Sequence, residues 1–470
     1  MNILEMGIDD LLKAYQAGTL SPVQVMETMI AQTDRVEPDL NAFVVRESSE
    51  RLLEMAKASE DRWRSDAPQG MLDGIPITVK DAILATPWPL RNGSHSTSDT
   101  PSNVDAPAVL SARKAGAIVV GKTTTPEFGW KAVTDSPLTG VTRNPWDLRT
   151  TPGGSSGGAA AAVAAGCAVA SIGTDAGGSV RIPAALCGLV ALKASRGRIP
   201  AFPPSAVWTA GHIGPIAHTV RDVARMLDVM KAPDPRDWNG LPPSDFSYLN
   251  DLDHHADIAG LRVAYSPTLG HATVDSEVAA LVENAVSVLS GLGAMVTTVA
   301  APLPDARKAF GTYFATGLDH ALRHLSNAQR EQLDPGLAFT LKSAQENTQQ
   351  AFLDAYDFQV RISREARLFH QQFDLLVTPT VSVPAFPVGR NVPEGYDQDD
   401  ILSWWPFTYP FNLSGQPALT VCCGYTRAGL PVGLQFVSEI YREELVLRAG
   451  AAFEANRTFS VRRAPCIQTG

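Results

Sequence analysis

The segment at residues 152–183 constrains the fold most, because glycines and serines flank an alanine-rich stretch: PGGSSGGAAAAVAAGCAVASIGTDAGGSVRIP. Glycine accepts positive φ and close backbone approach, so GGSSGG predicts a tight turn into a helix. The alanines at about 157–167 predict a helix that rises roughly 16 Å. CAVASIG predicts a returning strand that covers roughly 20 Å. Since the two lengths nearly cancel, we expect Ser155 at the helix entry to meet Ser179 after the strand.

The second glycine cluster, TDAGGS, offers donors for an anion. Successive backbone N–H groups of a glycine loop can point at one spot and bind negative charge. The oxyanion of a tetrahedral intermediate is such a charge, and a hydroxyl beside it is a candidate nucleophile. The alternative is that the glycines serve only close packing of a helix on a sheet. The residues alone leave both interpretations open.

A serine nucleophile needs a base, and none of the nine histidines lies close in sequence to these serines. Lys80, in ITVKDA, stands where the strand pattern turns its side chain away from Ile77 and Val79. Burial of a lysine in an apolar strand lowers its pKa. The alternative is an ordinary lysine at an exposed strand end.

The rest of the chain predicts an α/β protein, because helical and strand patterns alternate. We expect a helical segment at 1–65 and a Pro- and Asp-rich surface excursion at about 231–260. A strand–helix–strand unit follows the excursion, and 305–372 predicts two long helices. The remaining expected strands and helices are 75–83, 105–120, 261–266, 295–299, 374–380, 416–424, 430–438 and a final helix at 442–455.

Charge, cysteine content and hydropathy argue against several classes of protein. The formal net charge of −10, without a block of Lys and Arg, argues against nucleic acid and anionic membranes as partners. Five cysteines without C-x-x-C spacing argue against a disulfide framework or zinc site. The longest near-apolar run, 158–170, is too short to span a bilayer, and the N-terminus lacks a signal-peptide pattern. We therefore expect a cytoplasmic protein without a membrane partner.

Four stretches together resemble the amidase signature family: IPITVKDAI, GKTTTPEFGW, the glycine–serine segment and PFNLSGQPALTVCCGYTRAGLPVGLQFVS. The order and spacing of Lys80, Ser155 and Ser179 fit that family. The resemblance covers most of the chain and is weakest from about 231 to 400. It implies a single domain over 1–470 with a large mixed, mostly parallel sheet of about eleven strands, covered by helices on both faces.

The resemblance also implies roles. Ser179 would be the nucleophile, Ser155 the bridging serine reached through a cis peptide from Gly154, and Lys80 the general base. The reaction would pass through an acyl-enzyme that water hydrolyses, with no metal and no cofactor. The further implied residues are the oxyanion-hole N–H groups of Ala176, Gly177, Gly178 and Ser179, and the supporting Ser156, Asp175 and Arg181.

An aromatic-rich substrate pocket is the final implication. Buried rings favour large neutral groups, so we expect hydrolysis of hydrophobic aryl or alkyl amides, extending to carbamates and esters. The expected partner is a small-molecule amide or carbamate substrate. The resemblance leaves open whether the chain forms a homodimer. We expect about half of the candidate aromatics to face the site, the others being core or surface residues. These candidates are Phe128, Trp130, Phe202, Trp208, Trp404, Trp405, Phe407 and Phe411.

Three other motifs match parts of the sequence, but each lacks a feature that its own family requires. Residues 153–157 fit the G-x-S-x-G nucleophile elbow, but no strand pattern precedes them and no histidine follows His370. Ser111 and Lys114 fit S-x-x-K without its companion motifs, and GGSSGG lacks the Lys and Ser or Thr of a phosphate loop. The alternative within the family is an ammonia-producing glutaminase subunit of a tRNA-dependent amidotransferase. Such a subunit needs ionic groups for free glutamine, whereas 401–416 is strongly apolar.

Overall fold

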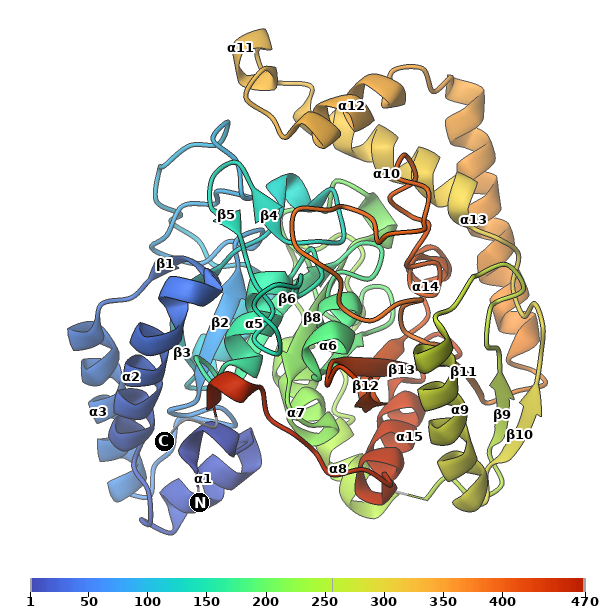
Figure 1. Ribbon diagram of the computed structural model, residues 1–470. Helices are drawn as coiled ribbons and strands as arrows, with labels where there is room; N and C mark the ends of the chain where they lie inside the picture. Colours follow the sequence, from blue (N-terminus) through green and yellow to red (C-terminus); the bar gives the residue numbers. More distant parts are fainter. Residues whose placement is uncertain (1, 256, 468–470) are drawn as a thin grey trace.

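A sheet of eleven strands runs through the centre of the computed structural model, which describes residues 2–255 and 257–467, and helices cover both faces (Figure 1). The strands of this sheet are β1 (Phe43–Arg46), β2 (Pro76–Lys80), β3 (Ile118–Thr123), β6 (Ala170–Asp175), β7 (Val190–Lys193), β8 (His212–Ala217), β9 (Arg262–Tyr265), β10 (Met295–Thr298), β11 (Leu375–Pro379), β12 (Ala418–Tyr425) and β13 (Pro431–Ser438). A separate hairpin joins β4 (Asp135–Ser136) and β5 (Gly140–Val141).

The strand order is β1-β3-β2-β6-β8-β7-β12-β13-β11-β9-β10. This confirms the predicted large mixed sheet. Parallel pairs join β3, β2 and β6 on one side and β11, β9 and β10 on the other. The centre, from β6 to β11, pairs antiparallel, so parallel pairs do not predominate there. The predicted strand–helix–strand unit is confirmed, since β9 and β10 are parallel neighbours joined through a helix.

The helices fall into three groups by position along the chain. Those before β8 are α1 (Ile8–Gln16), α2 (Pro22–Leu40), α3 (Ser49–Arg64), α4 (Pro107–Lys114), α5 (Gly157–Ala164) and α6 (Arg181–Cys187). Those between β8 and β11 are α7 (Val220–Met230), α8 (Tyr248–His254), α9 (Ser276–Gly291), α10 (Arg307–Leu322), α11 (Asn327–Arg330), α12 (Pro335–Ala344) and α13 (Gln349–Phe369). The last two are α14 (Tyr409–Ser414) and α15 (Glu443–Asn456).

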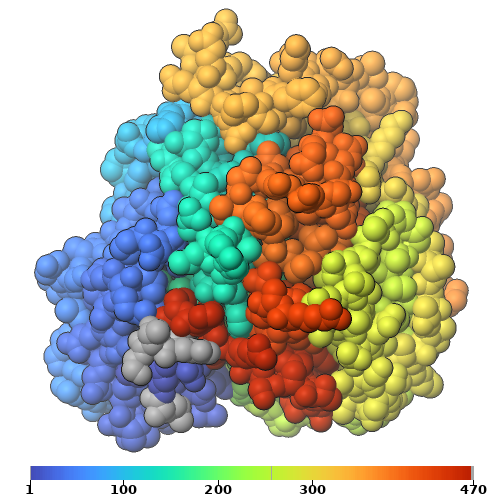
Figure 2. Space-filling view, viewed as in Figure 1, coloured from blue at the N-terminus to red at the C-terminus, as the bar shows by residue number. Residues whose placement is uncertain are grey.

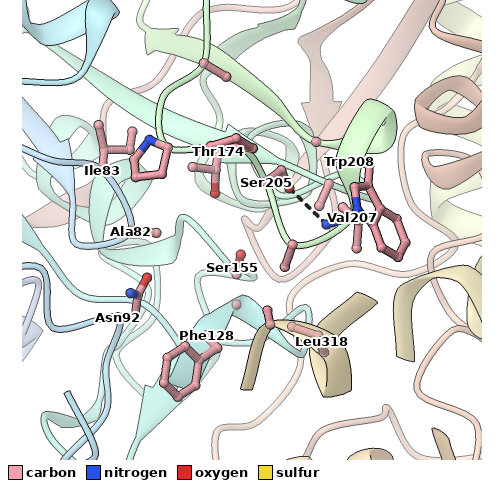
Figure 3. A pocket seen from close by; sticks show the side chains of 18 of the residues that line it. Ala82, Ile83, Asn92, Phe128, Ser155, Thr174, Ser205, Val207, Trp208 and Leu318 are labelled. Carbon is pink, nitrogen blue, oxygen red and sulfur yellow. Dashed lines mark hydrogen bonds between the residues drawn. The ribbon is translucent and has the colours of Figure 1, made fainter. Parts of the chain in front are cut away.

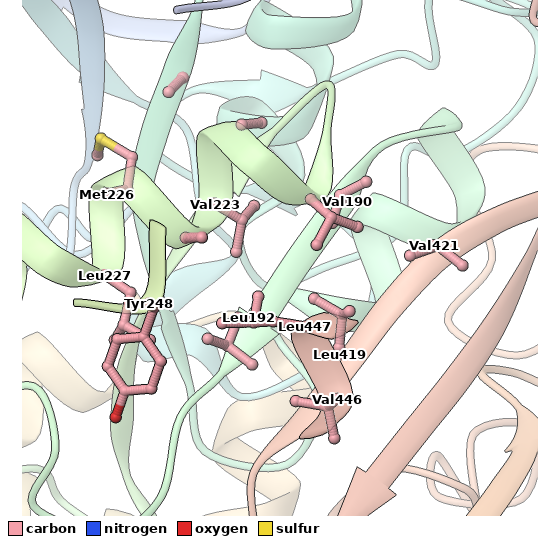
Figure 4. Packing of buried hydrophobic residues seen from close by; sticks show 14 of the residues in the cluster. Val190, Leu192, Val223, Met226, Leu227, Tyr248, Leu419, Val421, Val446 and Leu447 are labelled. Carbon is pink, nitrogen blue, oxygen red and sulfur yellow. The ribbon is translucent and has the colours of Figure 1, made fainter. Parts of the chain in front are cut away.

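The largest apolar core lies between the sheet and helices α7, α8 and α15 (Figure 4). Val190 and Leu192 of β7 and Leu419 of β12 lie against Val223 of α7 and Leu447 of α15, and all five are buried. Burial of apolar area stabilises a fold by about 25 cal/mol per Å². This core therefore holds helices α7, α8 and α15 against one face of the sheet.

A helical cap covers one end of the molecule. Helices α10, α11 and α12 gather there, in gold in Figure 2, and α13 runs from this end down one edge of the molecule (Figure 1). The two long helices predicted at 305–372 correspond to α10 and α13, whereas the shorter α11 and α12 between them were not predicted. Side-chain caps divide the segment: Ser326, Asp334 and Thr348 each accept a hydrogen bond from a backbone N–H and begin a new helix.

Other sequence predictions need smaller corrections. The helical segment at 1–65 also contains strand β1, and the excursion at 231–260 contains helix α8, which Ser247 caps. Strands β7 and β8 were not predicted individually. None of the helices in residues 2–255 and 257–467 is long and apolar enough to cross a membrane.

Candidate active site

Lys80 ends strand β2, which lies between β3 and β6 in the sheet. Ile77 and Val79 belong to the main core, whereas the fully buried Lys80 side chain bonds elsewhere. Its Nζ donates to Ser155 Oγ at 2.6 Å and to Thr174 Oγ1 at 2.8 Å. Burial lowers the pKa of Lys80 to about 7, although the negative charge of Asp175 acts to raise it. A neutral amine near pH 7 can accept a proton.

Ser155 lies at the entry to α5 and is almost fully buried. The peptide bond between Gly154 and Ser155 is cis, and the next hydroxyl, of Ser156, donates to Thr174 O at 3.1 Å. The backbone of Gly129 passes close to the Ser155 hydroxyl, since a Cβ there would lie 3.1 Å from its Oγ. The serine hydroxyl is thus held between the lysine and this backbone.

Helix α5 and strand β6 bring the two glycine clusters together. Helix α5 packs on β2, β6 and β8, and its Gly and Ala side is small enough for close contact. The Ser156 N–H donates to Ser179 O at 3.1 Å, so the two serine segments meet at the backbone. Ser179 is partly exposed, and no hydrogen bond joins its hydroxyl to Ser155 Oγ among the described residues. The structure therefore joins Lys80 directly to Ser155, and it brings the backbone of Ser179 to Ser156, the residue after Ser155.

The loop from Ala176 to Ser179 carries four backbone N–H groups with no acceptor within the described ranges. Its carbonyls are used instead: Gly177 O accepts from Thr408 Oγ1 at 2.5 Å, and Gly178 O accepts from Ile182 N at 2.8 Å. Gly178 has φ +138°, and a Cβ there would collide with the Thr408 side chain. Glycine is required at this position for both conformation and space, and the loop leaves its donors for another acceptor.

Asp175 and Arg181 form a fully buried ion pair behind this loop. Arg181 Nε and Nη2 donate to the two carboxylate oxygens at 3.0 and 2.9 Å. Burial by itself raises the pKa of Asp175, but the Arg181 charge and its hydrogen bonds outweigh it and hold the pKa well below its usual range. The pair stays charged and fixes the loop that begins at Ala176.

Three further polar residues complete this network, and the sequence reasoning missed them. Arg181 also donates to Thr408 O at 3.0 Å, Gln435 Oε1 at 2.8 Å and Asn412 Oδ1 at 2.7 Å. Asn412 in turn donates to Asp175 Oδ1 at 2.8 Å. The available signal was a polar residue inside an apolar run, as in PFNLSG and VGLQFV, because buried polar groups require partners.

A cavity of about 600 Å³ opens onto this site. Lys80, Ser155 and Thr174 are polar residues of its lining, and much of the remaining wall comes from segment 201–213 and helix α10. Figure 3 shows Phe128 and Leu318 on one side of Ser155 and Trp208 on another. Of the aromatic residues predicted for the pocket, Phe128, Phe202 and Trp208 line this cavity.

The other five candidate aromatics do not line the cavity, so three of the eight line it where about half were expected. Trp404 and Phe407, in the segment before α14, and Phe411, in α14, are buried in a second apolar core, which also includes Phe310 of α10. Trp130 packs among the leucines of α10 and α12. Trp405 packs on Phe310 with ring centroids 6.0 Å apart. An apolar run shows that rings are buried, but the tertiary contacts decide whether they face a core or a cavity.

The competing motifs find no support in the geometry. A nucleophile elbow needs a strand directly before Ser155, yet β5 ends at Val141 and 142–155 holds only isolated bridges. Ser111 and Lys114 lie on α4, where Lys114 is exposed. The described residues include no group of three or more His, Cys, Asp or Glu that could hold a metal ion.

The charge of the cavity wall is low. Lys80 is its only Lys, and Arg, Asp and Glu are absent from the described residues that line it. His212, His320 and His324 are the other titratable residues. Burial lowers the pKa of His212 well below its usual value, so this imidazole is neutral. The cavity suits a neutral ligand.

Comparisons with known proteins agree with this geometry. The sequence model of the Amidase family matches residues 24–447. The acylamidase of Rhodococcus erythropolis is 36% identical over 468 residues, which cover 98% of this chain and 97% of that protein. A glutamyl-tRNA(Gln) amidotransferase subunit of Chloroflexus aurantiacus is 34% identical over 470 residues, with 94% of each chain covered.

Solved structures resemble the whole chain. A 6-aminohexanoate cyclic dimer hydrolase complexed with substrate has a TM-score of 0.88 and 28% identity, with 100% of both chains covered. A bacterial aryl acylamidase of the amidase signature enzymes has a TM-score of 0.88 and 27% identity, with 96% of both chains covered. These matches extend over both glycine clusters and both sides of the sheet. The chain therefore belongs to the amidase signature family.

Proposed function

We propose that this protein hydrolyses the carbon–nitrogen bond of amides through an acyl-enzyme on Ser179. The observation that carries the proposal is the buried Lys80 amine, 2.6 Å from Ser155 Oγ, with its pKa lowered to about 7. A lysine with an ordinary pKa of about 10.4 is neutral in only about 0.04% of molecules at pH 7. Burial removes this obstacle, so Lys80 can serve as a base at neutral pH.

In the proposed mechanism a proton moves from Ser179 to Ser155 and from Ser155 to Lys80. The Ser179 oxygen then forms a bond to the substrate carbonyl carbon, and the carbonyl oxygen becomes an oxyanion. The N–H groups of residues 176–179 would stabilise this charge, because preorganised donors act strongly in a site that excludes water. The proton returns to the leaving amine as the C–N bond breaks. Water then hydrolyses the acyl-enzyme by the same proton route.

We assign a hydrophobic aryl or alkyl amide as the substrate class. Phe128, Phe202, Trp208 and Leu318 supply apolar surface around the site, and such walls favour large neutral groups. A carbamate or ester has a planar carbonyl of the same kind, so we include both as secondary substrates. The relatives that are named as acylamidases act on amides by their names. We also keep a cytoplasmic location in this proposal, since all five cysteines are free thiols.

A glutaminase component of an amidotransferase is the second candidate, because one such protein is 34% identical to this chain. Free glutamine carries an α-carboxylate and an α-ammonium group, which require charged partners when they leave water. The cavity wall offers no Arg, Asp or Glu among the described residues. This difference in charge favours the neutral amide.

Labelling of the nucleophile tests the proposal. A fluorophosphonate probe should add once to the wild-type chain, on Ser179, and intact mass followed by peptide mapping should locate the adduct. Ser179→Ala should abolish the adduct and lower kcat for a p-nitroanilide by several orders of magnitude. Ser111→Ala, on helix α4, is the matched control and should keep both adduct and rate. An adduct on Ser155 would overturn the assignment of the nucleophile.

A further inference from the structure

Helix α13 exposes four large apolar side chains on one face. Its opposite face, with Ala355, Gln359, Ile362 and Ala366, is buried against the body of the protein. Figure 1 shows the helix running along one edge of the molecule. Single exposed apolar residues are ordinary, but several on one helix face mark a candidate interaction site. The four exposed residues are Leu353 (45% exposed), Tyr356 (51%), Val360 (57%) and Leu368 (50%).

The charges on the same face are separated along the helix. Asp354 and Asp357 lie in the N-terminal half, and Arg361, Arg364 and Arg367 lie in the C-terminal half, all exposed. Within the part of the chain that the structure describes, neither Asp357 nor Arg364 forms an ion pair. Among the described residues Asp354 accepts a hydrogen bond from the Gln350 amide, and Arg367 forms an ion pair with Glu439 at 3.8 Å. Asp357 and Arg364 are therefore exposed charges of opposite sign, one in each half of the helix, and neither has an ion-pair partner among the described residues.

We infer that this face binds a second copy of the same chain, with the two α13 helices antiparallel around a two-fold axis near Val360 and Arg361. A two-fold interface requires that residue i meets j and j meets i. In this register Asp357 lies opposite the second copy's Arg364, and Asp354 lies opposite its Arg367. Leu353 lies opposite Leu368, and every pair occurs twice. Each aspartate of one copy then lies opposite an arginine of the other copy.

The charge pattern selects this orientation and this partner. A parallel pair would place aspartates on aspartates and arginines on arginines, which is unfavourable. A partner of uniform charge would be attracted by one half of the helix and repelled by the other. An identical helix in antiparallel orientation matches both halves with its own sequence. The pattern is therefore complementary to itself.

The size of the face determines the strength of the complex. A helix of this length is about 31 Å long, and its footprint is smaller than the roughly 800 Å² per partner of a standard interface. We therefore expect a dimer that dissociates on dilution and weakens with salt, because exposed charges are screened. The dimer would hold α13 in place next to the cavity wall. Phe352 of α13 contacts Trp208 of that wall, with ring centroids 5.5 Å apart.

Charge reversal tests the interface on the full chain. Sedimentation velocity from about 1 to about 200 μM should show a reversible monomer–dimer equilibrium, in the range of weak interfaces. Asp357→Arg alone and Arg364→Asp alone should each shift the chain to monomer, because each places like charges opposite one another. The double variant Asp357→Arg with Arg364→Asp should restore the dimer. Asp245→Arg, with the same charge change at an exposed position in 231–260, should leave the dimer unchanged.

A cysteine pair tests the orientation. An equimolar mixture of the Leu353→Cys and Leu368→Cys variants should form a disulfide-linked heterodimer on mild oxidation, whereas each variant alone should not. Circular dichroism and thermal unfolding of each variant establish that it is folded. A chain that stays monomeric throughout the concentration range would overturn the proposal. A dimer that survives the single reversals, or that the double variant fails to restore, would overturn it as well.

Discussion

The Nζ of Lys80 and the Oγ of Ser155 lie 2.6 Å apart, and both side chains are buried. The two residues come from different parts of the architecture: Lys80 ends a sheet strand, and Ser155 precedes the alanine-rich helix. Burial makes the charged ammonium unfavourable and so leaves the amine free to accept a proton at neutral pH. The same packing that fixes the helix on the sheet thus sets the chemistry of the base.

The pH dependence of the reaction follows from the lowered pKa of Lys80. The neutral amine is the active form, so kcat/KM should rise about tenfold per pH unit below about 7 and level off above it. Lys80→Ala should lose this rising limb together with most of the rate. Lys80→Arg should do the same, because a guanidinium stays charged throughout. Rates between pH 5 and pH 9 on a p-nitroanilide are the measurement. Wild-type rates and pH dependence in Lys80→Ala would contradict the role.

The local part of the site was predictable from the sequence. Glycine clusters around an alanine run fix a turn, a short helix and a return strand, and these elements form at α5 and β6. Alternation within IPITVKDAI correctly separated Lys80 from Ile77 and Val79. Predictions of this kind succeed because residues close together in the sequence determine turns, short helices and the faces of a strand.

Long-range features were not predictable in the same way. Asn412 binds Asp175 across 237 residues of sequence, and nothing local indicates that contact. The aromatic run at 404–411 indicated burial, yet the rings of Trp404, Phe407 and Phe411 enter the second core instead of the cavity. Strands β7 and β8 owe their place to neighbours on both sides of the sheet. In each case the tertiary environment decides what the local pattern leaves open.

The buried ion pair of Asp175 and Arg181 should be important for stability. Arg181→Met leaves the Asp175 carboxylate buried without its counter-charge, and breaking such a pair costs about 3–5 kcal/mol. We expect a fall of that size in the free energy of unfolding, measured with urea. The loss should be greatest near neutral pH and should shrink in acid, where protonation removes the unpaired charge.

The double variant Asp175→Asn with Arg181→Met distinguishes charge from packing. It removes both charges, so it should be less destabilised than the sum of the single variants. Arg149→Met is the matched control, because its ion pair with Asp147 involves an arginine that is almost fully exposed. Exposed pairs contribute about 0–1 kcal/mol. Additive losses in the double variant would show that the pair is not coupled.

Trp208 should determine the preference for bulky substrates. It lines the cavity at φ +43°, and its ring packs on Tyr313 and Phe352 with centroids 5.2 and 5.5 Å apart. Trp208→Ala removes apolar wall area, so the ratio of kcat/KM for an aryl amide over propionamide should fall by about 10–200-fold, the range for lost apolar contacts. Phe246→Ala, an exposed aromatic in 231–260, should leave this ratio unchanged. An unchanged ratio in a folded Trp208→Ala enzyme, or a wild-type preference for free glutamine, would show that this wall does not select the substrate.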